Sequence, residues 1–198
     1  MDQPVNLTFP ILSGEIMLEF QEQRNIVIAD TITDDLALKV MLLLRRMDQQ
    51  SNDPIYLYIN SGGGSVIAGL TIVDNMSLIK SPVYTVCYGI AASMAAVIFS
   101  CGQKGHRYMT AHSELMIHQP WNSASISGMK ETDLVGLAEE MSNTRRKLEE
   151  ILAKNSGKTL KEIHNACEKD NYLDPDEAIA MGLADKIIQS EKTGKVED

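Results

Sequence analysis

Residues 83–99, Val-Tyr-Thr-Val-Cys-Tyr-Gly-Ile-Ala-Ala-Ser-Met-Ala-Ala-Val-Ile-Phe, decide the fold of this chain. The β-branched and aromatic run 83–87 predicts a buried strand, which Gly89 ends, and the Ala-rich segment after it predicts a helix. Ser93 lies where this helix begins, and its small neighbours allow a sharp turn that presents the side chain to a substrate. N–H groups at the helix start are then free to stabilise an oxyanion. On this stretch alone, a serine that only caps a core helix is the commoner arrangement, and both interpretations stay open.

Strand-like and helix-like segments alternate along the rest of the sequence. Apolar, β-branched runs predict strands at residues 25–29, 55–59, 107–110, 114–118 and 184–188. Apolar residues at helical spacing and capping boxes predict helices at 33–47, 66–79 and 131–155, and shorter ones that begin at Thr159 and Asp174. This alternation predicts the α/β class, with parallel strands joined by right-handed crossovers.

The composition is that of an ordinary globular protein, with 44% apolar and 23% charged residues. The length predicts a single domain, which we assign to residues 21–188. Residues 1–20 are weakly patterned and are expected to form a flexible arm, and the polar residues 189–198 are expected to form a disordered tail. The net charge of −9 argues against a nucleic-acid partner, because binding to phosphates requires a basic surface.

The three cysteines, Cys87, Cys101 and Cys167, are expected to be reduced thiols that form neither a disulfide nor a metal site. No basic region precedes Arg24, so the sequence predicts no signal peptide. The uncharged stretch 81–103 has the length of a membrane span, but a buried strand followed by a buried helix explains it better. We therefore predict a cytoplasmic protein that does not enter a membrane.

Residues 60–65, Asn-Ser-Gly-Gly-Gly-Ser, join an expected strand to an expected helix. Three consecutive glycines permit positive φ angles and a close approach of the backbone to a ligand. Because no Gly-Lys-Ser/Thr follows and no dinucleotide fingerprint fits, the sequence predicts neither an ATP site nor a cofactor. A groove formed by the backbone or an oxyanion contact is the better functional interpretation of this segment, and a plain turn is the alternative.

A general base for Ser93 has to be one of four histidines. His118 ends an apolar strand, at the kind of sheet edge where α/β proteins build their sites. His106 and His112 lie in polar turns and are expected to be solvated, whereas His164 lies on a short amphipathic helix.

A carboxylate is then needed to orient the imidazole and to stabilise its cation. Four candidates lie within one stretch of the chain: Glu168, Asp170, Asp174 and Asp176. Asp174 is better explained as the N-cap of a helix, and composition does not choose among the others.

Four motifs occur together in one order and spacing: Asn-Ser-Gly-Gly-Gly-Ser-Val at 60–66, Gly-Ile-Ala-Ala-Ser-Met-Ala at 89–95, Met-Ile-His-Gln-Pro at 116–120 and Lys-Asp-Asn-Tyr-Leu at 169–173. Through them the chain, from about residue 24 to residue 188, resembles the proteolytic subunits of the ATP-dependent Clp protease family. The resemblance implies a crotonase-like fold of repeated ββα units with a protruding handle, which would comprise residues 119–155.

The resemblance also implies the chemistry of a serine endopeptidase that forms an acyl-enzyme and needs no metal or cofactor. Ser93 would be the nucleophile, His118 the general base and later the general acid, and Asp170 the residue that orients His118. The backbone N–H groups of Gly64 and Met94 would form the oxyanion hole.

Further expectations from the resemblance concern assembly. Two stacked heptameric rings, with a paralogous subunit as an additional option, would enclose a chamber in which peptides and unfolded proteins are cleaved. An AAA+ unfoldase would deliver the substrates and dock on apolar pockets lined by Tyr56 and Tyr58.

The chain departs from the family pattern at four places, the first of which is the N-terminal arm, which matches the family poorly. Gly62 replaces the usual proline, and residues 121–128 replace the usual Gly-rich handle segment. Glu168-Lys169 replaces an Asp-Arg pair that contacts the facing ring, and this contact should be weaker because lysine lacks the bidentate fork of arginine.

Two other functions are weighed against the peptidase. The first is a catalytically silent or specialised subunit of a mixed ring, which the altered handle and arm would suit. The second is an acyl-CoA enzyme of the same fold, in which the N–H groups of Gly64 and Met94 would stabilise a thioester enolate. A membrane protein is a distant third alternative.

Overall fold

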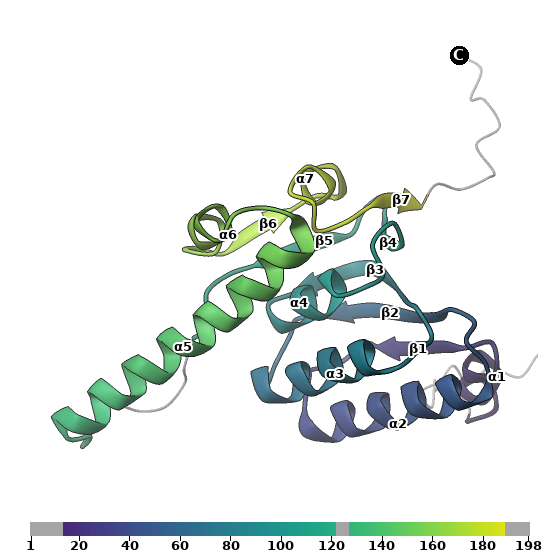
Figure 1. The fold of residues 1–198 in the computed structure, drawn as a ribbon, viewed down its shortest axis with the longest axis horizontal. Coiled ribbons are helices and arrows are strands. Elements are labelled where there is room, and N and C mark those ends of the chain that lie inside the picture. Colours follow the sequence, from purple (N-terminus) through teal and green to yellow (C-terminus); the bar gives the residue numbers. More distant parts are fainter. Residues whose placement is uncertain (1–13, 122–126, 189–198) are drawn as a thin grey trace, which may run out of the picture.

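The computed structural model describes residues 14–121 and 127–188, and a seven-stranded sheet lies at its centre (Figure 1). The main path of the sheet is β1-β2-β3-β4-β7, and β5 and β6 extend it from β3. All neighbours are parallel except β5 and β6, which confirms the predicted α/β class. The strands are β1 Asn25–Ile28, β2 Ile55–Ser61, β3 Val83–Ala92, β4 Arg107–Thr110, β5 Glu114–Ile117, β6 Asn171–Leu173 and β7 Lys186–Ile188.

Strand β3 changes partners along its length. Residues 85–87 pair with β4, and residues 90–92 pair with β5. Between them Gly89 has φ +85°, and a Cβ at this position would lie 2.5 Å from the side-chain oxygen of Asn60. The prediction that Gly89 ends the strand is therefore wrong: the glycine allows the strand to turn from one partner to the next and to continue to Ala92.

Helices cover the sheet where the apolar spacing predicts them. α2 and α3 pack against each other beside β1 and β2, and α4 lies between the sheet and α5, whose other end extends away from the body (Figure 1). The helices are α1 Gly14–Glu22, α2 Asp34–Gln50, α3 Val66–Leu78, α4 Met94–Ser100, α5 Glu131–Ser156, α6 Leu160–Ala166 and α7 Pro175–Ala180.

Helix α1 occupies residues for which the sequence analysis predicted no regular structure. It includes residues 14–20 of the expected arm. The ring of Phe20 lies 5.4 Å from the ring of Tyr58 on β2, which gives the helix an aromatic contact that sequence periodicity does not reveal. The other residues of the expected arm, 1–13, and the expected tail, 189–198, lie outside the described residues.

Polar side chains begin the two short helices near the C-terminus. The hydroxyl of Thr159 accepts a hydrogen bond from the Glu162 N–H, and the Glu162 carboxylate accepts one in return from the Thr159 N–H. The Asp174 carboxylate likewise accepts from the Glu177 N–H at 2.8 Å. The prediction that Asp174 is an N-cap is therefore confirmed.

The uncharged stretch of the sequence forms the interior. Every residue of α4 is buried, and no helix of the described residues is long and apolar enough to cross a membrane. Cys87 and Cys167 are buried free thiols, as predicted, and Cys101 is partly buried. Burial raises the pKa of Cys87 to about 11 and that of Cys167 to about 12, so both stay protonated at neutral pH.

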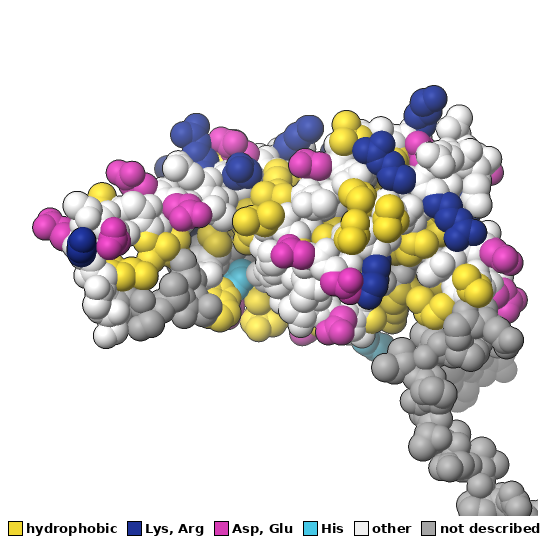
Figure 2. Space-filling view, turned by 90° about the horizontal axis from the view of Figure 1, so that it is seen from below, with side chains coloured by type: hydrophobic (Ala, Val, Ile, Leu, Met, Phe, Trp, Pro, Cys, Tyr) yellow, Lys and Arg dark blue, Asp and Glu magenta, His cyan; other side chains and the backbone are white. Residues whose placement is uncertain are grey.

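An exposed apolar surface lies over the two helices at the base of the molecule. Figure 2 shows hydrophobic side chains gathered on this face. Between 50% and 78% of each of four large side chains on α2 and α3 is exposed: Leu38, Leu42, Ile67 and Leu78. Soluble monomers rarely expose such a set together, so this face is suited to a protein contact.

A buried ion pair joins β4 to the segment that leads into β7. The side chain of Arg107 is 2% exposed, and its guanidinium donates two hydrogen bonds to the Asp185 carboxylate, at 2.6 and 2.8 Å. Desolvation pushes the pKa of Asp185 upward, but hydrogen bonds from Arg107 and its positive charge outweigh this and hold the pKa below its usual value. A depressed carboxyl pKa stabilises the fold at neutral pH.

Asp185→Asn is expected to lower the free energy of unfolding by about 3 kcal/mol at pH 7, because the variant leaves a buried guanidinium without its counter-charge. The difference in free energy of unfolding between the variant and the wild type should reach its full value above about pH 4, the ordinary carboxyl pKa. It should shrink as the pH falls through the lower pKa of folded Asp185. Urea unfolding of both proteins across this range measures the difference, and a pH-independent value would contradict the assignment.

Candidate active site

The backbone of Ser93 adopts a conformation that few residues with a side chain adopt. It has φ 56° and ψ −122°, between the end of β3 and the first turn of α4. Its N–H donates to the Met116 carbonyl at 2.8 Å, which fixes the turn against β5. Ser93 is the N-cap residue of α4 by position, but its side chain makes no capping hydrogen bond, so capping does not explain a serine at this place. Such strained turns present a side chain outward at functional sites.

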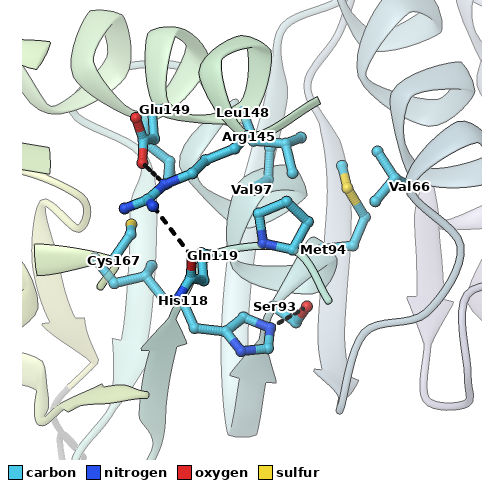
Figure 3. Close-up of a pocket in the computed structure, with 13 residues that line it drawn as sticks. Val66, Ser93, Met94, Val97, His118, Gln119, Arg145, Leu148, Glu149 and Cys167 are labelled. Atoms are coloured by element: carbon cyan, nitrogen blue, oxygen red, sulfur yellow. Dashed lines mark hydrogen bonds and ion pairs between the residues drawn. The ribbon is translucent and has the colours of Figure 1, made fainter. Parts of the chain in front are cut away.

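His118 directly follows β5, which runs parallel to the second half of β3. This pairing brings two residues that are 25 positions apart in the sequence into contact. The Nε2 atom of His118 lies 2.8 Å from the Ser93 hydroxyl oxygen, and the imidazole is 13% exposed (Figure 3). Such a geometry allows His118 to accept the hydroxyl proton.

Asp170 reaches the other side of the same imidazole. β6 pairs antiparallel with β5, with Asn171 opposite Ile117, so Asp170 and His118 stand opposite each other just beyond the paired residues. The Asp170 Oδ1 atom lies 3.0 Å from His118 Nδ1, and the carboxylate is 62% exposed. The sequence analysis did not predict β6, although this strand sets the position of Asp170.

The other candidate carboxylates lie elsewhere. Asp174 caps α7, Asp176 lies in the first turn of that helix, and Glu168 is exposed. The structure therefore brings one of the four candidates to His118, and it is the one that the family motif implies.

The Gly-rich segment lies directly against Ser93. A Cβ on Gly63, which has φ +96°, would lie 2.8 Å from the Cβ of Ser93 and 3.1 Å from the backbone nitrogen of Met94. The segment is fixed by hydrogen bonds from the Ile32 N–H to the Gly63 carbonyl and from the Ser65 N–H to the Ile32 carbonyl. Within the described part of the chain, the N–H groups of Gly64 and Met94 have no acceptor, so both can donate to a ligand.

Alanine substitutions at adjacent glycines should have opposite effects. Nothing lies within 4 Å of a Cβ at Gly62, so Gly62→Ala should stabilise the protein by about 0.4–1 kcal/mol and keep its activity. Gly63→Ala meets both a positive φ and a collision with Ser93, and should cost about 1–3 kcal/mol and slow hydrolysis. Thermal unfolding and peptide assays compare the variants, and equal effects would contradict the close approach of Gly63 to Ser93.

A pocket opens beside Ser93 and His118. Its walls are mainly apolar, and α3, α4 and α5 supply Val66, Met94, Val97, Leu148 and Leu152. Arg145 and Glu149 of α5 also line it, close to Gln119 and Cys167 (Figure 3). The sequence analysis did not single out Arg145 or Glu149. Arg145, Leu148, Glu149 and Leu152 follow the i, i+3, i+4, i+7 spacing of a single helix face, and this spacing was a usable signal.

An aromatic surface includes the two tyrosines expected to bind a partner. Tyr56 and Tyr58 alternate on β2 with rings 6.4 Å apart, and Tyr84 lies 5.3 Å from Tyr56. His106 stacks on Tyr84 at 3.8 Å, and its Nδ1 atom lies 2.7 Å from the Tyr108 hydroxyl. The prediction that His106 is simply solvated is wrong, because flat rings on neighbouring strands stack on this surface.

The two remaining histidines, His112 and His164, differ in their surroundings. His112 is exposed, as expected, whereas His164 contacts the Glu149 carboxylate through Nδ1 at 3.1 Å. Among the described residues, no group of three or more His, Cys, Asp or Glu side chains could hold a metal ion.

Comparisons with known proteins identify the family. The family model for Clp protease matches residues 12–191. Over 179 residues, the chain is 43% identical to the ATP-dependent Clp protease proteolytic subunit of Streptococcus mutans and 42% identical to those of Streptococcus uberis and Streptococcus pyogenes serotype M1. Each alignment covers 90% of this chain and 91% of the relative. The chain therefore belongs to the Clp protease family of serine peptidases, and its fold is that of the family.

Proposed function

We propose that this chain is the peptidase subunit of a ring-shaped, ATP-dependent protease and cleaves peptides and unfolded proteins through an acyl-enzyme. The observation that carries the proposal is the continuous hydrogen-bonded chain from Asp170 through His118 to Ser93, with distances of 3.0 and 2.8 Å. Family membership supports a serine peptidase.

Each member of this chain has a separate role. Asp170 accepts a hydrogen bond from Nδ1–H of His118, which leaves Nε2 unprotonated and able to take the hydroxyl proton of Ser93. The serine oxygen then attacks the peptide carbonyl, and His118 passes the proton to the leaving amine. Water hydrolyses the resulting ester by the same proton transfers in reverse order.

The oxyanion of the tetrahedral intermediate is stabilised by the N–H groups of Gly64 and Met94. Two features support this: both groups have no acceptor within the described part of the chain, and Gly63 lies against Ser93 and Met94. One such donor contributes about 3–4 kcal/mol to stabilisation of the transition state in comparable enzymes.

Members of the Clp protease family assemble as oligomeric rings that work with AAA+ ATPases. We propose two stacked heptameric rings for this chain. The exposed apolar face of α2 and α3, shown in Figure 2, supports side-by-side contacts within a ring. Leu134 and Val135, exposed on the protruding part of α5, support a contact with a helix of the facing ring. Glu168 and Lys169 are exposed, and we expect their contact with the facing ring to be weaker than that of an Asp-Arg pair.

Docking of an AAA+ unfoldase is proposed at Tyr56 and Tyr58. Their contacts with Phe20 and Tyr84 form an aromatic surface that suits an apolar segment of a partner. We further propose a role in cytoplasmic protein quality control, because free thiols are the usual state of cysteine in that compartment.

The main alternative is a silent or specialised subunit of a mixed ring. The altered handle segment that motivates it falls mostly on residues 122–126, outside the described residues. The aligned Ser93, His118 and Asp170 favour an active subunit, since a silent one needs no such arrangement. An acyl-CoA enzyme would likewise need no serine that is hydrogen-bonded to a histidine.

Two measurements on the purified protein distinguish these functions. The first is the size of its assembly, and the second is cleavage of short fluorogenic peptides and of a folded protein. We expect a ring-sized particle that cleaves the peptides and leaves the folded protein intact. Peptide cleavage only after addition of a paralogous subunit would support the mixed-ring alternative. No cleavage under either condition would show that the proposal is wrong.

A further inference from the structure

Asp170 lies where the pairing of its strand with β5 has just ended. β6 has three residues, and its last pair on this side joins Asn171 to Ile117, so Asp170 and His118 stand beyond the paired residues. Within the described part of the chain, the 3.0 Å contact with His118 is the only hydrogen bond of the Asp170 side chain, which is 62% exposed. The position of this carboxylate therefore depends on how the segments around it are held.

Gln119 links the two segments again just past His118 and Asp170. Its N–H donates to the Cys167 carbonyl at 2.7 Å, and its side-chain nitrogen donates to the Glu168 carbonyl at 3.0 Å. Gln119 directly follows His118, and both carbonyls belong to the segment that leads into Asp170. Strand pairing on one side and the bonds of Gln119 on the other therefore hold His118 opposite Asp170.

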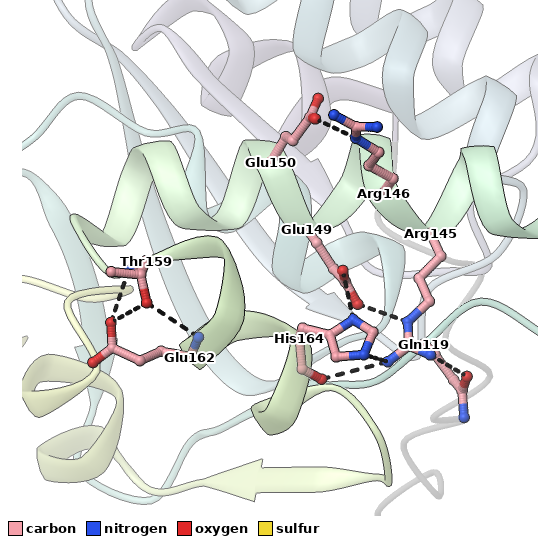
Figure 4. Close-up of polar contacts among 8 residues, drawn as sticks. All are labelled: Gln119, Arg145, Arg146, Glu149, Glu150, Thr159, Glu162 and His164. Atoms are coloured by element: carbon pink, nitrogen blue, oxygen red, sulfur yellow. Dashed lines mark hydrogen bonds and ion pairs between the residues drawn. The ribbon is translucent and has the colours of Figure 1, made fainter.

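Arg145 of α5 fixes the orientation of the Gln119 amide. Gln119 is exposed, so water competes for both ends of this amide. The guanidinium of Arg145 donates to the side-chain oxygen of Gln119 at 3.1 Å (Figure 4). Since a guanidinium only donates hydrogen bonds, this contact turns the amide oxygen toward α5 and leaves the amide nitrogen to donate to the Glu168 carbonyl.

The guanidinium of Arg145 is itself held by a buried partner. Its Nε atom donates to Glu149 Oε1 at 2.7 Å, and the Glu149 side chain is only 7% exposed. The second carboxylate oxygen contacts Nδ1 of His164 at 3.1 Å, and Arg145 also donates to the His164 carbonyl at 3.4 Å. Charge-assisted bonds of this kind leave the guanidinium little freedom to turn away from Gln119.

We infer that Gln119 is a positioning residue for hydrolysis and that Arg145 acts through it, because together they keep Asp170 within hydrogen-bond reach of His118. The inference rests on the proposed peptidase function and adds two residues to its site. Without the side-chain bonds of Gln119, Asp170 would lie away from His118 in a larger fraction of molecules. The imidazole would then be oriented for proton transfer less often.

Two variants loosen this link in different ways. Gln119→Leu removes both side-chain bonds and keeps the backbone bond to Cys167, and it should lower kcat by about tenfold and change KM by less than about twofold. Arg145→Lys keeps a positive charge beside Glu149, but an ammonium group lacks the fork that reaches Glu149 and Gln119 together. It should lower kcat by about threefold. Steady-state kinetics with a short fluorogenic peptide measure both effects.

The neighbouring residue on α5 provides the matched control. Arg146 donates to Glu150 at 2.9 Å with the same spacing, but the two side chains are 74% and 54% exposed and neither contacts Gln119 (Figure 4). Arg146→Lys makes the same chemical change as Arg145→Lys on the same helix. It should keep the kcat and KM of the wild type.

A second background separates positioning from a general structural role. In Asp170→Ala no carboxylate is left to be positioned, so adding Gln119→Leu should lower kcat by less than about twofold further. If Gln119 instead supported the fold or bound the substrate directly, its loss would lower kcat by the same factor in both backgrounds.

The values of kcat are expressed per assembled subunit, with assembly measured by sizing chromatography. Should Gln119→Leu fail to assemble, Arg145→Lys takes its place in the comparison with Asp170→Ala. A wild-type kcat in both single variants, or equal factors in the two backgrounds, would overturn the inference. A wild-type protein whose Ser93 does not react with a fluorophosphonate would instead overturn the proposed function.

Discussion

Ser93→Ala is expected to lower kcat for peptide hydrolysis by about a millionfold and to abolish covalent labelling by a fluorophosphonate. The substitution removes the only atom that can form the acyl-enzyme and leaves His118 without its 2.8 Å hydrogen-bond partner. The fold should be retained, because the Ser93 side chain makes no capping bond to α4. Peptide assays and gel-based labelling on the same sample measure both effects.

A serine on the surface of α3 provides the control for this variant. Ser77 is exposed, and its hydroxyl donates only to the Asp74 carbonyl within the helix. Ser77→Ala should therefore hydrolyse peptides and react with the label at the wild-type rate. Labelling or hydrolysis that persists in Ser93→Ala would mean that another residue is the nucleophile.

Asp170→Asn should reduce kcat by roughly a thousandfold to ten-thousandfold and change KM little. The amide of asparagine can donate to Nδ1 of His118, which would move the ring proton to Nε2, the atom that faces Ser93. A protonated Nε2 cannot accept the hydroxyl proton. The effect falls short of that of Ser93→Ala because the nucleophile remains and the carboxylate is 62% exposed.

Asp176→Asn is the matched control for this loss. Asp176 lies in the first turn of α7 and does not contact His118, so its neutralisation should cost at most about 0.3–1 kcal/mol of stability and leave kcat unchanged. Steady-state kinetics on all three proteins make the comparison. A kcat of Asp170→Asn equal to that of the wild type would remove Asp170 from the mechanism.

Local sequence patterns predicted most of the helices and strands, because apolar spacing and capping residues act within a single element. Helix α5 follows from its apolar spacing and from Gly157, which ends it with φ +77°. Strand β6 has only three residues and forms because it pairs with β5, which is more than fifty positions away, so no local pattern reveals it. The continuation of β3 past Gly89 likewise depends on a second partner strand.

The candidate site shows the same division between local and distant information. Small residues around Ser93 allowed a nucleophile there, but composition left Glu168, Asp170 and Asp176 open as its carboxylate partner, and only the family motif singled out Asp170. The difference between Arg145–Glu149 and Arg146–Glu150 was also missed, because both pairs have the spacing of surface ion pairs on a helix. Burial separates the two pairs, and the sequence indicates it only through the place of Arg145 and Glu149 on the same helix face as Leu148 and Leu152.

The proposed function requires that folding makes the Ser93 hydroxyl reactive by bringing it to His118 and Asp170. The most direct test is to label the assembled wild-type protein with a fluorophosphonate, digest it and locate the adduct by mass spectrometry. We expect a single adduct, on Ser93, that forms in step with the loss of peptide hydrolysis. An adduct on a different residue, or complete inactivation without modification of Ser93, would contradict the account.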